Sequence, residues 1–104
     1  DLSSSSFRRA NLRDVTATAA LLDGVDFRAA TLSNAKLDSA VLSSSDLRGA
    51  DLSNADISGA DLRGADLRDC KLDGSTRTSV IVDASTQGLP AAGNASAKPS
   101  EDAL

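Results

Sequence analysis

The feature that most constrains the fold of this chain is a repeat of five residues. From Ala50 to Asp69 the sequence consists of four consecutive pentapeptides: Ala-Asp-Leu-Ser-Asn, Ala-Asp-Ile-Ser-Gly, Ala-Asp-Leu-Arg-Gly and Ala-Asp-Leu-Arg-Asp. The same register extends from Leu2 to Leu72, where 14 of the 15 central positions hold Leu, Phe or Ile and Ala17 is the exception. The position two residues earlier is small in nearly every repeat. Two positions in five are therefore apolar, and the other three are mostly polar.

A period of five fits neither an α-helix nor a flat strand. On a helix it would rotate successive apolar residues by about 140°, and on a straight strand it would place them on alternate faces. The two apolar positions of one repeat are two residues apart, so they point to the same side of a short extended segment. We therefore expect the chain to bend after each segment and to coil around an apolar axis. Successive coils would stack at the strand spacing of about 4.8 Å, which describes a β-solenoid.

This repeat resembles that of the pentapeptide-repeat proteins, whose pattern is similar to Ala-Asp/Asn-Leu-x-x. The resemblance covers residues 1–74. It implies an all-β fold, a right-handed quadrilateral parallel β-helix with four pentapeptides per coil. Fifteen repeats would form just under four coils, followed by a non-repetitive C-terminal tail.

A coil of twenty residues can be tested against the positions of the aromatic side chains. The two aromatic residues of the chain, Phe7 and Phe27, are separated by twenty positions, and Leu47 and Leu67 continue the same spacing. We expect these four side chains to stack in one interior column.

The same spacing predicts two columns of charged residues on the outer surface. One column contains arginines at Arg8, Arg28, Arg48 and Arg68. The other lies two residues earlier in each repeat and contains Ser6, Asp26, Asp46 and Asp66. Either these columns recognise a partner, or each arginine is bracketed by carboxylates in a solvated ladder whose ion pairs contribute little.

A possible apolar docking patch lies on another face. Leu21 and Val41 are twenty residues apart at outward positions where the repeat usually has Asp or Asn. We therefore treat them as candidate partner-binding residues, although single exposed apolar residues are common on protein surfaces.

The composition excludes most enzyme chemistry. The chain of 104 residues has no His, Trp, Tyr or Met, and its net charge is −4. Cys70 occupies an inward small-residue position with no histidine to activate it, so we interpret it as a packing residue. No loop has the spacing of calcium ligands and no glycine-rich phosphate loop is present. We therefore expect no catalytic residue, cofactor or metal.

The repeat is expected to end near Gly74, because Arg77 is incompatible with an apolar interior site. Residues 75–84 include the β-prone run Val80–Val82 and are predicted to cap the solenoid by crossing or extending its last coil; a homodimer contact is the alternative. Residues 85–104 are predicted to be an extended, low-complexity tail. The predicted boundaries are thus 1–74 for the β-helix, 75–84 for the cap and 85–104 for the tail.

Two functions compete at this point. The first is a non-catalytic structural or interaction subunit, a rigid rod that docks onto protein partners in a larger assembly without binding nucleic acid directly. The alternative, implied by the resemblance, is a DNA mimic that binds topoisomerases and protects them from quinolones. Residues 1–74 hold twelve Asp and nine Lys or Arg, which is few net charges for a rod that imitates DNA.

The expected location follows from the missing methionine and from the resemblance. No apolar run is long enough to span a membrane, and we expect the chain to be a processed product. The resemblance favours the thylakoid lumen of a chloroplast, or another organelle, after removal of a targeting peptide. The bacterial cytoplasm is the alternative.

Overall fold

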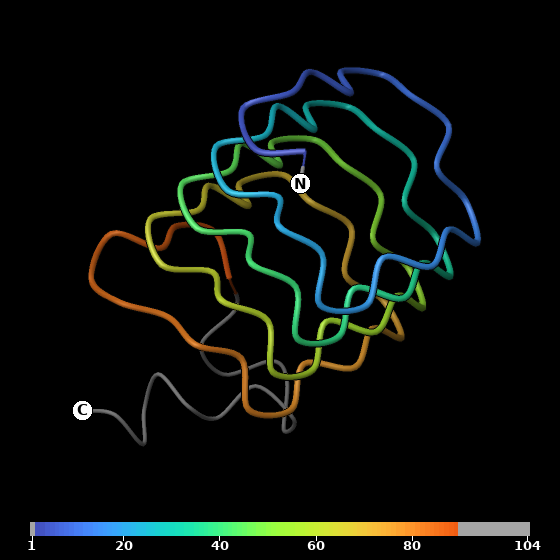
Figure 1. The fold of residues 1–104 in the computed structure, drawn as a ribbon. Coiled ribbons are helices and arrows are strands. Elements are labelled where there is room, and N and C mark those ends of the chain that lie inside the picture. The colour runs from blue at the N-terminus through green and yellow to red at the C-terminus, as the bar shows by residue number, and fades with distance from the viewer. Residues whose placement is uncertain (1, 90–104) are drawn as a thin grey trace.

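The computed structural model describes residues 2–89, which form a stack of coils (Figure 1). Within these residues there is no helix, and each strand is a single-residue parallel bridge. The bridges join residues twenty apart, from Ser6 with Asp26 to Asp61 with Ile81. The predicted twenty-residue coil is therefore confirmed, while the right-handed twist of the coil stays a prediction.

Each pentapeptide contains a tight turn that bends the chain inward. The central residue of a repeat accepts a hydrogen bond from the backbone N–H three residues later, as between Ala50 N and Leu47 O at 3.0 Å. The residue two positions after the central one has a positive φ throughout, for example 58° at Ala29 and 70° at Gly49. A type II turn requires this conformation at its third residue. The repeat has Ala, Ser, Asn, Asp or Arg at this position in several coils, although glycine would adopt the positive φ with less strain.

The other backbone groups bond between coils, and the Asp side chain completes the set. In the repeat 45–49 all five N–H groups have an acceptor. The pairs are Ser45 N to Leu42 O, Asp46 N to Val25 O, Leu47 N to Asp66 O, Arg48 N to Asp46 Oδ1 and Gly49 N to Arg68 O. The carboxylate thus accepts the one N–H that bonds neither to a turn carbonyl nor to a neighbouring coil. This explains why Asp or Asn precedes the central residue so often, because an unpaired backbone donor is costly.

The core is a column of apolar layers along the coil axis. The central Leu, Phe and Ile residues and the small residues of the middle coils are almost completely buried, as Leu47 and Ala50 at 0% exposure show. The rings of Phe7 and Phe27 stack with centroids 5.8 Å apart and planes 15° from parallel. The predicted interior column of aromatic residues is therefore confirmed.

The first coil is less completely packed than those above it. Leu2 is 48% exposed, and Phe7, Leu12 and Ala17 are only partly buried. A hollow of about 120 Å³, lined by apolar side chains that include these four, lies at this end. Ala17 and Val15 both contribute to its lining, so the exchange of a large for a small side chain in this repeat does not fill the layer.

The coils continue past Gly74, and the expectation for Arg77 is wrong. Arg77 occupies the inward central position at 6% exposure, and burial lowers the pKa of its guanidinium. Two bridges, from Asp56 to Thr76 and from Asp61 to Ile81, keep the twenty-residue register beyond it. Residues 75–84 therefore extend the last coil. The coils pair through backbone groups that every residue carries, so one charged side chain at an inward position does not interrupt the backbone path.

The first residues of the predicted tail are also part of the stack. Asp66 bridges to Gln87, twenty-one residues later, so one residue is inserted into this coil. The hydroxyl of Thr86 donates to Leu62 O at 2.7 Å, and Leu89 packs against the core. The stack thus comprises four full coils and part of a fifth. Residues 90–104, the remainder of the predicted tail, lie outside the described part of the chain.

No helix among the described residues is long and apolar enough to cross a membrane.

Candidate interaction surfaces

The predicted columns of arginine and aspartate form one continuous ladder. Arg28 and Arg48 each make a bidentate ion pair with the carboxylate two residues earlier, at 2.8 Å to Asp26 and 2.7 Å to Asp46. Each also approaches the carboxylate of the next coil, with Nε of Arg28 3.7 Å from Asp46 and Nε of Arg48 3.8 Å from Asp66. Each of these arginines is therefore bracketed by two carboxylates, as the ladder interpretation predicts.

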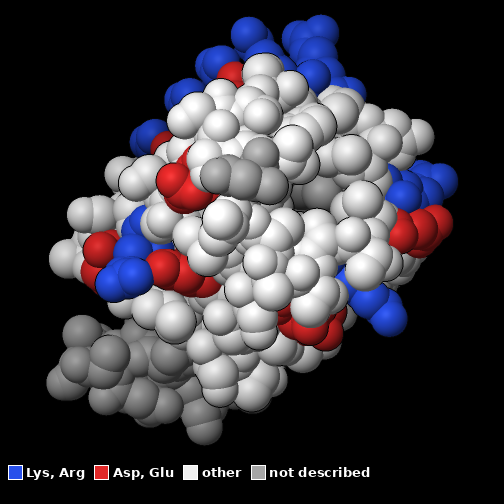
Figure 2. Space-filling model, in the orientation of Figure 1, with Lys and Arg blue, Asp and Glu red and all other residues white. Residues whose placement is uncertain are grey.

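The ladder keeps its carboxylates ionised. The hydrogen bonds from Arg28, and then its charge, lower the pKa of Asp26 to about 2. Hydrogen bonds from Arg48 and Arg68 lower the pKa values of Asp46 and Asp66 in the same way. Because these side chains are partly exposed, solvent weakens each ion pair, and the ladder contributes more to surface pattern than to stability. Figure 2 shows basic side chains along the upper-left edge of the molecule with acidic ones set between them.

The N-terminal end of the ladder differs from its middle. Arg8 follows Ser6 in place of an aspartate, and Arg9 lies at the next turn with φ 63°. Among residues 2–89, neither guanidinium has an ion pair or hydrogen bond with a carboxylate. Within the described part of the chain, Arg8 at the start of the arginine column and Arg9 beside it therefore have no carboxylate that neutralises them directly.

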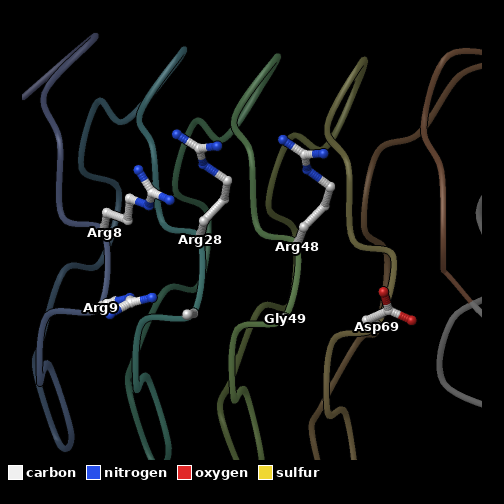
Figure 3. A pocket seen from close by; sticks show the side chains of 7 residues that line it. Arg8, Arg9, Arg28, Arg48, Gly49 and Asp69 are labelled. Atoms are coloured by element: carbon white, nitrogen blue, oxygen red, sulfur yellow. The ribbon is translucent and has the colours of Figure 1, made fainter.

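These two arginines lie at one end of a surface groove of about 360 Å³. In Figure 3, Arg8, Arg28 and Arg48 form a row on one side, and Arg9, Gly49 and Asp69 lie along the other. The predicted site residues do not include four that line the groove: Arg9, Ala29, Gly49 and Asp69. The twenty-residue spacing, applied to the turn position as well as to the outward ones, would have found them.

The two residues of the predicted apolar patch lie in one column that continues to Ile81, while their role in docking stays a prediction. Leu21 bridges to Val41, Val41 to Asp61 and Asp61 to Ile81. Leu21 and Ile81 are each 46% exposed, and Val41 is partly exposed. The sequence analysis does not include Ile81 because it ends the register before Arg77, although Ile81 is three coils above Leu21. We call Leu21, Val41 and Ile81 the apolar column.

The remaining chemistry-bearing groups belong to the fold. Cys70 is partly buried, its thiol donates to Leu47 O at 3.1 Å, and burial raises its pKa to about 12. A thiol of this kind is a weak nucleophile at neutral pH. Within residues 2–89 no three residues of the types His, Cys, Asp and Glu lie close enough together to hold a metal ion.

The stacked coils and patterned outer columns define a repeat solenoid whose distinguishing features are on its surface. A family model described as pentapeptide repeats matches residues 5–43 and 35–74 in eight copies. The chain therefore belongs to the pentapeptide-repeat family.

Several solved structures resemble the chain. Rfr23, a pentapeptide repeat protein of the cyanobacterium Cyanothece 51142, is 26% identical with a TM-score of 0.58, and the match covers 85% of this chain and 63% of Rfr23. A pentapeptide repeat protein of Nostoc PCC 7120 is 35% identical with a TM-score of 0.42, over 80% of this chain and 73% of its own. A pentapeptide repeat protein from the Arabidopsis thaliana thylakoid lumen is 31% identical with a TM-score of 0.37, and the match covers 77% of this chain and 63% of that protein. No curated protein matches the sequence.

Proposed function

We propose that this chain is a non-catalytic interaction subunit, a rigid right-handed, four-sided β-helical rod that docks onto a protein partner through the apolar column. The observation that carries this proposal is the distribution of exposed large apolar side chains. Among the described residues these are Leu2, Leu21 and Ile81. Leu2 lines the apolar hollow at the N-terminal end of the stack, so the exposed outward side chains are those of Leu21 and Ile81, which lie on one face.

The apolar column suits a partner with its own short apolar ridge. Leu21 and Ile81 are three coils apart, about 14 Å at the strand spacing, with Val41 between them. Asp61 lies in the same column, but its carboxylate is held by Arg63 at 2.7 Å, so it adds a neutralised polar group. A small apolar centre with polar groups around it is typical of transient protein interfaces.

A DNA mimic is less well supported by the surface electrostatics. Mimicry requires a row of carboxylates that faces a basic partner without compensation, at a density comparable to that of DNA phosphates. The column of Asp26, Asp46 and Asp66 is instead paired with arginines, which reduces its negative potential.

The test compares capture of partners from a native extract by the native chain, two variants and a control variant. The captured protein is then identified and titrated at two salt concentrations. The variants are L21S with V41S and I81S, and D26N with D46N and D66N. We expect the apolar variant to lose the partner and the Asp variant to keep it, because apolar burial carries the affinity. K36S, an outward change on another face, is the control. Loss confined to the Asp variant, with strong salt dependence, would favour the DNA mimic and contradict the proposal.

A further contact and the location of the chain stay predictions. The alternative role of residues 75–84 is a homodimer contact, and sedimentation at several concentrations tests it. Removal of the low-complexity tail in the capture experiment should begin after Leu89, because Thr86, Gln87 and Leu89 belong to the stack.

The expected thylakoid or other organellar location is tested by locating the tagged chain in fractionated cells.

A further inference from the structure

The groove between the arginine column and the neighbouring turns has a charge pattern of its own. Arg8 and Arg9 lie at one end and Asp69 at the other, while Gly49 lies along the groove between them (Figure 3). The face that contains the groove holds five arginines and four aspartates in residues 2–89, a net charge of +1, although the whole chain is acidic at −4. An anionic group is therefore attracted to this face in preference to the rest of the surface.

The positive end of the groove is free to bind because of one sequence difference. Arg28, Arg48 and Arg68 each lie two residues after an aspartate that accepts at least two hydrogen bonds from the guanidinium. Arg8 follows Ser6, which has no carboxylate to offer. The charge of Arg8 acts on Asp26 in the next coil, but the carboxylate of Asp26 accepts its hydrogen bonds from Arg28. The guanidinium fork of Arg8 is thus available for a carboxylate from outside, and Arg9 lies beside it.

The length of the groove sets the spacing of complementary charges on a ligand. Arg9 and Asp69 are three coils apart in the same turn column, about 14 Å at the strand spacing. An extended peptide advances about 3.3 Å per residue, so side chains four residues apart span nearly this distance. Residues four apart also lie on the same side of an extended strand. One peptide segment can therefore place an acidic side chain at Arg8 and Arg9 and a basic one at Asp69.

We propose that this groove binds an extended segment of a partner protein that carries an acidic side chain and, four residues away, a basic one. This inference deepens the proposed function as an interaction subunit and rests on it, but it uses a different face from the apolar column. The carboxylates of Asp46, Asp66 and Asp69 on this face would repel the successive phosphates of a nucleic acid. A peptide with charges of both signs meets no such repulsion.

The experiment titrates the full chain, by NMR at low salt, with heptapeptides of Ser and Thr that carry one Glu and one Lys four residues apart, in both orders. We expect R8S combined with R9N to weaken binding about tenfold, since two charge-assisted contacts are lost. Asn at position 9 tolerates the positive φ of that turn. R13S is the matched control, because Arg13 lies at the equivalent position of the same coil on the next face and contacts Ser33 at 3.4 Å.

The opposite end of the groove is tested by a double-mutant cycle. D69N should weaken binding of the Glu/Lys peptide about threefold and leave unchanged the affinity of a peptide in which Gln replaces Lys. D73N, an exposed change on the next face, should leave both affinities unchanged. Thermal melts of all variants by circular dichroism verify that the coils are intact.

Three outcomes would overturn the inference. They are an absence of peptide binding, equal losses in the R13S and R8S/R9N variants, and tighter binding of a thymidine oligonucleotide than of the peptide with the same dependence on Arg8 and Arg9. The L21S/V41S/I81S variant separates this inference from the proposed function. This variant should bind the peptide with the affinity of the native chain. The peptide titration therefore tests the groove even if the apolar column captures no partner.

Discussion

The first coil and the middle coils are built from the same five-residue repeat but have different properties. In the middle coils the central residues are buried, as Leu47 is at 0% exposure, and each ladder arginine has carboxylates on both sides. In the first coil Leu2 is 48% exposed, the interior has a hollow, and Arg8 and Arg9 have no carboxylate partner in residues 2–89. Burial and charge pairing in this fold come from neighbouring coils, so binding capacity is left where the neighbours or the pairing residues are missing.

The largest expected effect tests whether burial depends on the coil and not on the repeat. L47D places a charge between Phe27 and Leu67 with no partner, so it should lower the free energy of unfolding by about 5 kcal/mol or more. L12D makes the same change at the same repeat position of the first coil and should cost about 1–2 kcal/mol, because the side chain can reach water. Denaturant unfolding measures both; equal costs would show that the first coil is as well packed as the middle ones.

The second effect tests the docking of residues 82–89 on the coil below. Gly88 has φ 84°, and a Cβ there would collide with the backbone of Leu67 and Arg68. At Gly49, with φ 70°, the nearest atom to such a Cβ is 4.0 Å away. G49A should therefore cost about 1 kcal/mol for the backbone conformation. G88A should have the same backbone cost and lower the free energy of unfolding by a further amount of about 1–3 kcal/mol, because the added Cβ collides with the backbone. Equal costs would mean that the end of the stack does not pack as closely as described.

A smaller effect concerns acid and the ladder of the middle coils. The pKa of Asp26 is about 2 in the folded chain against an ordinary value of 3.8. The folded state therefore favours the ionised form of this carboxylate. The stability from this pairing is complete above pH 4 and is lost as the pH falls from about 4 to about 2. Melting temperatures measured across this interval should fall more for the native chain than for D26N/D46N/D66N. Parallel curves would show that the ladder makes no net contribution.

The smallest effect is expected at Cys70. C70A should change the free energy of unfolding by less than about 1 kcal/mol, because Ala is the commonest residue at this position. The native thiol, with its pKa raised to about 12 by burial, should react with a disulfide reagent at least about tenfold more slowly than in the unfolded chain. Labelling at the unfolded rate would contradict its placement beside Leu47.

The residues of the repeat made most of the fold predictable. The spacing of Phe7 and Phe27 was enough to predict the coil length, and the alternation of Arg and Asp predicted the ladder. Arg77 misled the prediction, because a charged residue at an inward position looks like the end of an apolar core. The backbone pairs between coils through groups that every residue carries, so one unfavourable side chain does not break the register. The insertion before Gln87 also left no signal in the periodicity.

The sequence by itself determined the repeat, the family and the columns, since a strict period maps linear positions onto stacked ones. Only the tertiary structure decided which members of each column remain available to a partner. The sequence shows Ser6 in place of an aspartate before Arg8, but only the structure shows that the carboxylate of Asp26 in the next coil pairs with Arg28 and not with Arg8. Leu21 and Ile81 come onto one face only because the coil continues past Arg77. Availability depends on neighbours in space, and these are brought together by the stacking of coils twenty residues apart.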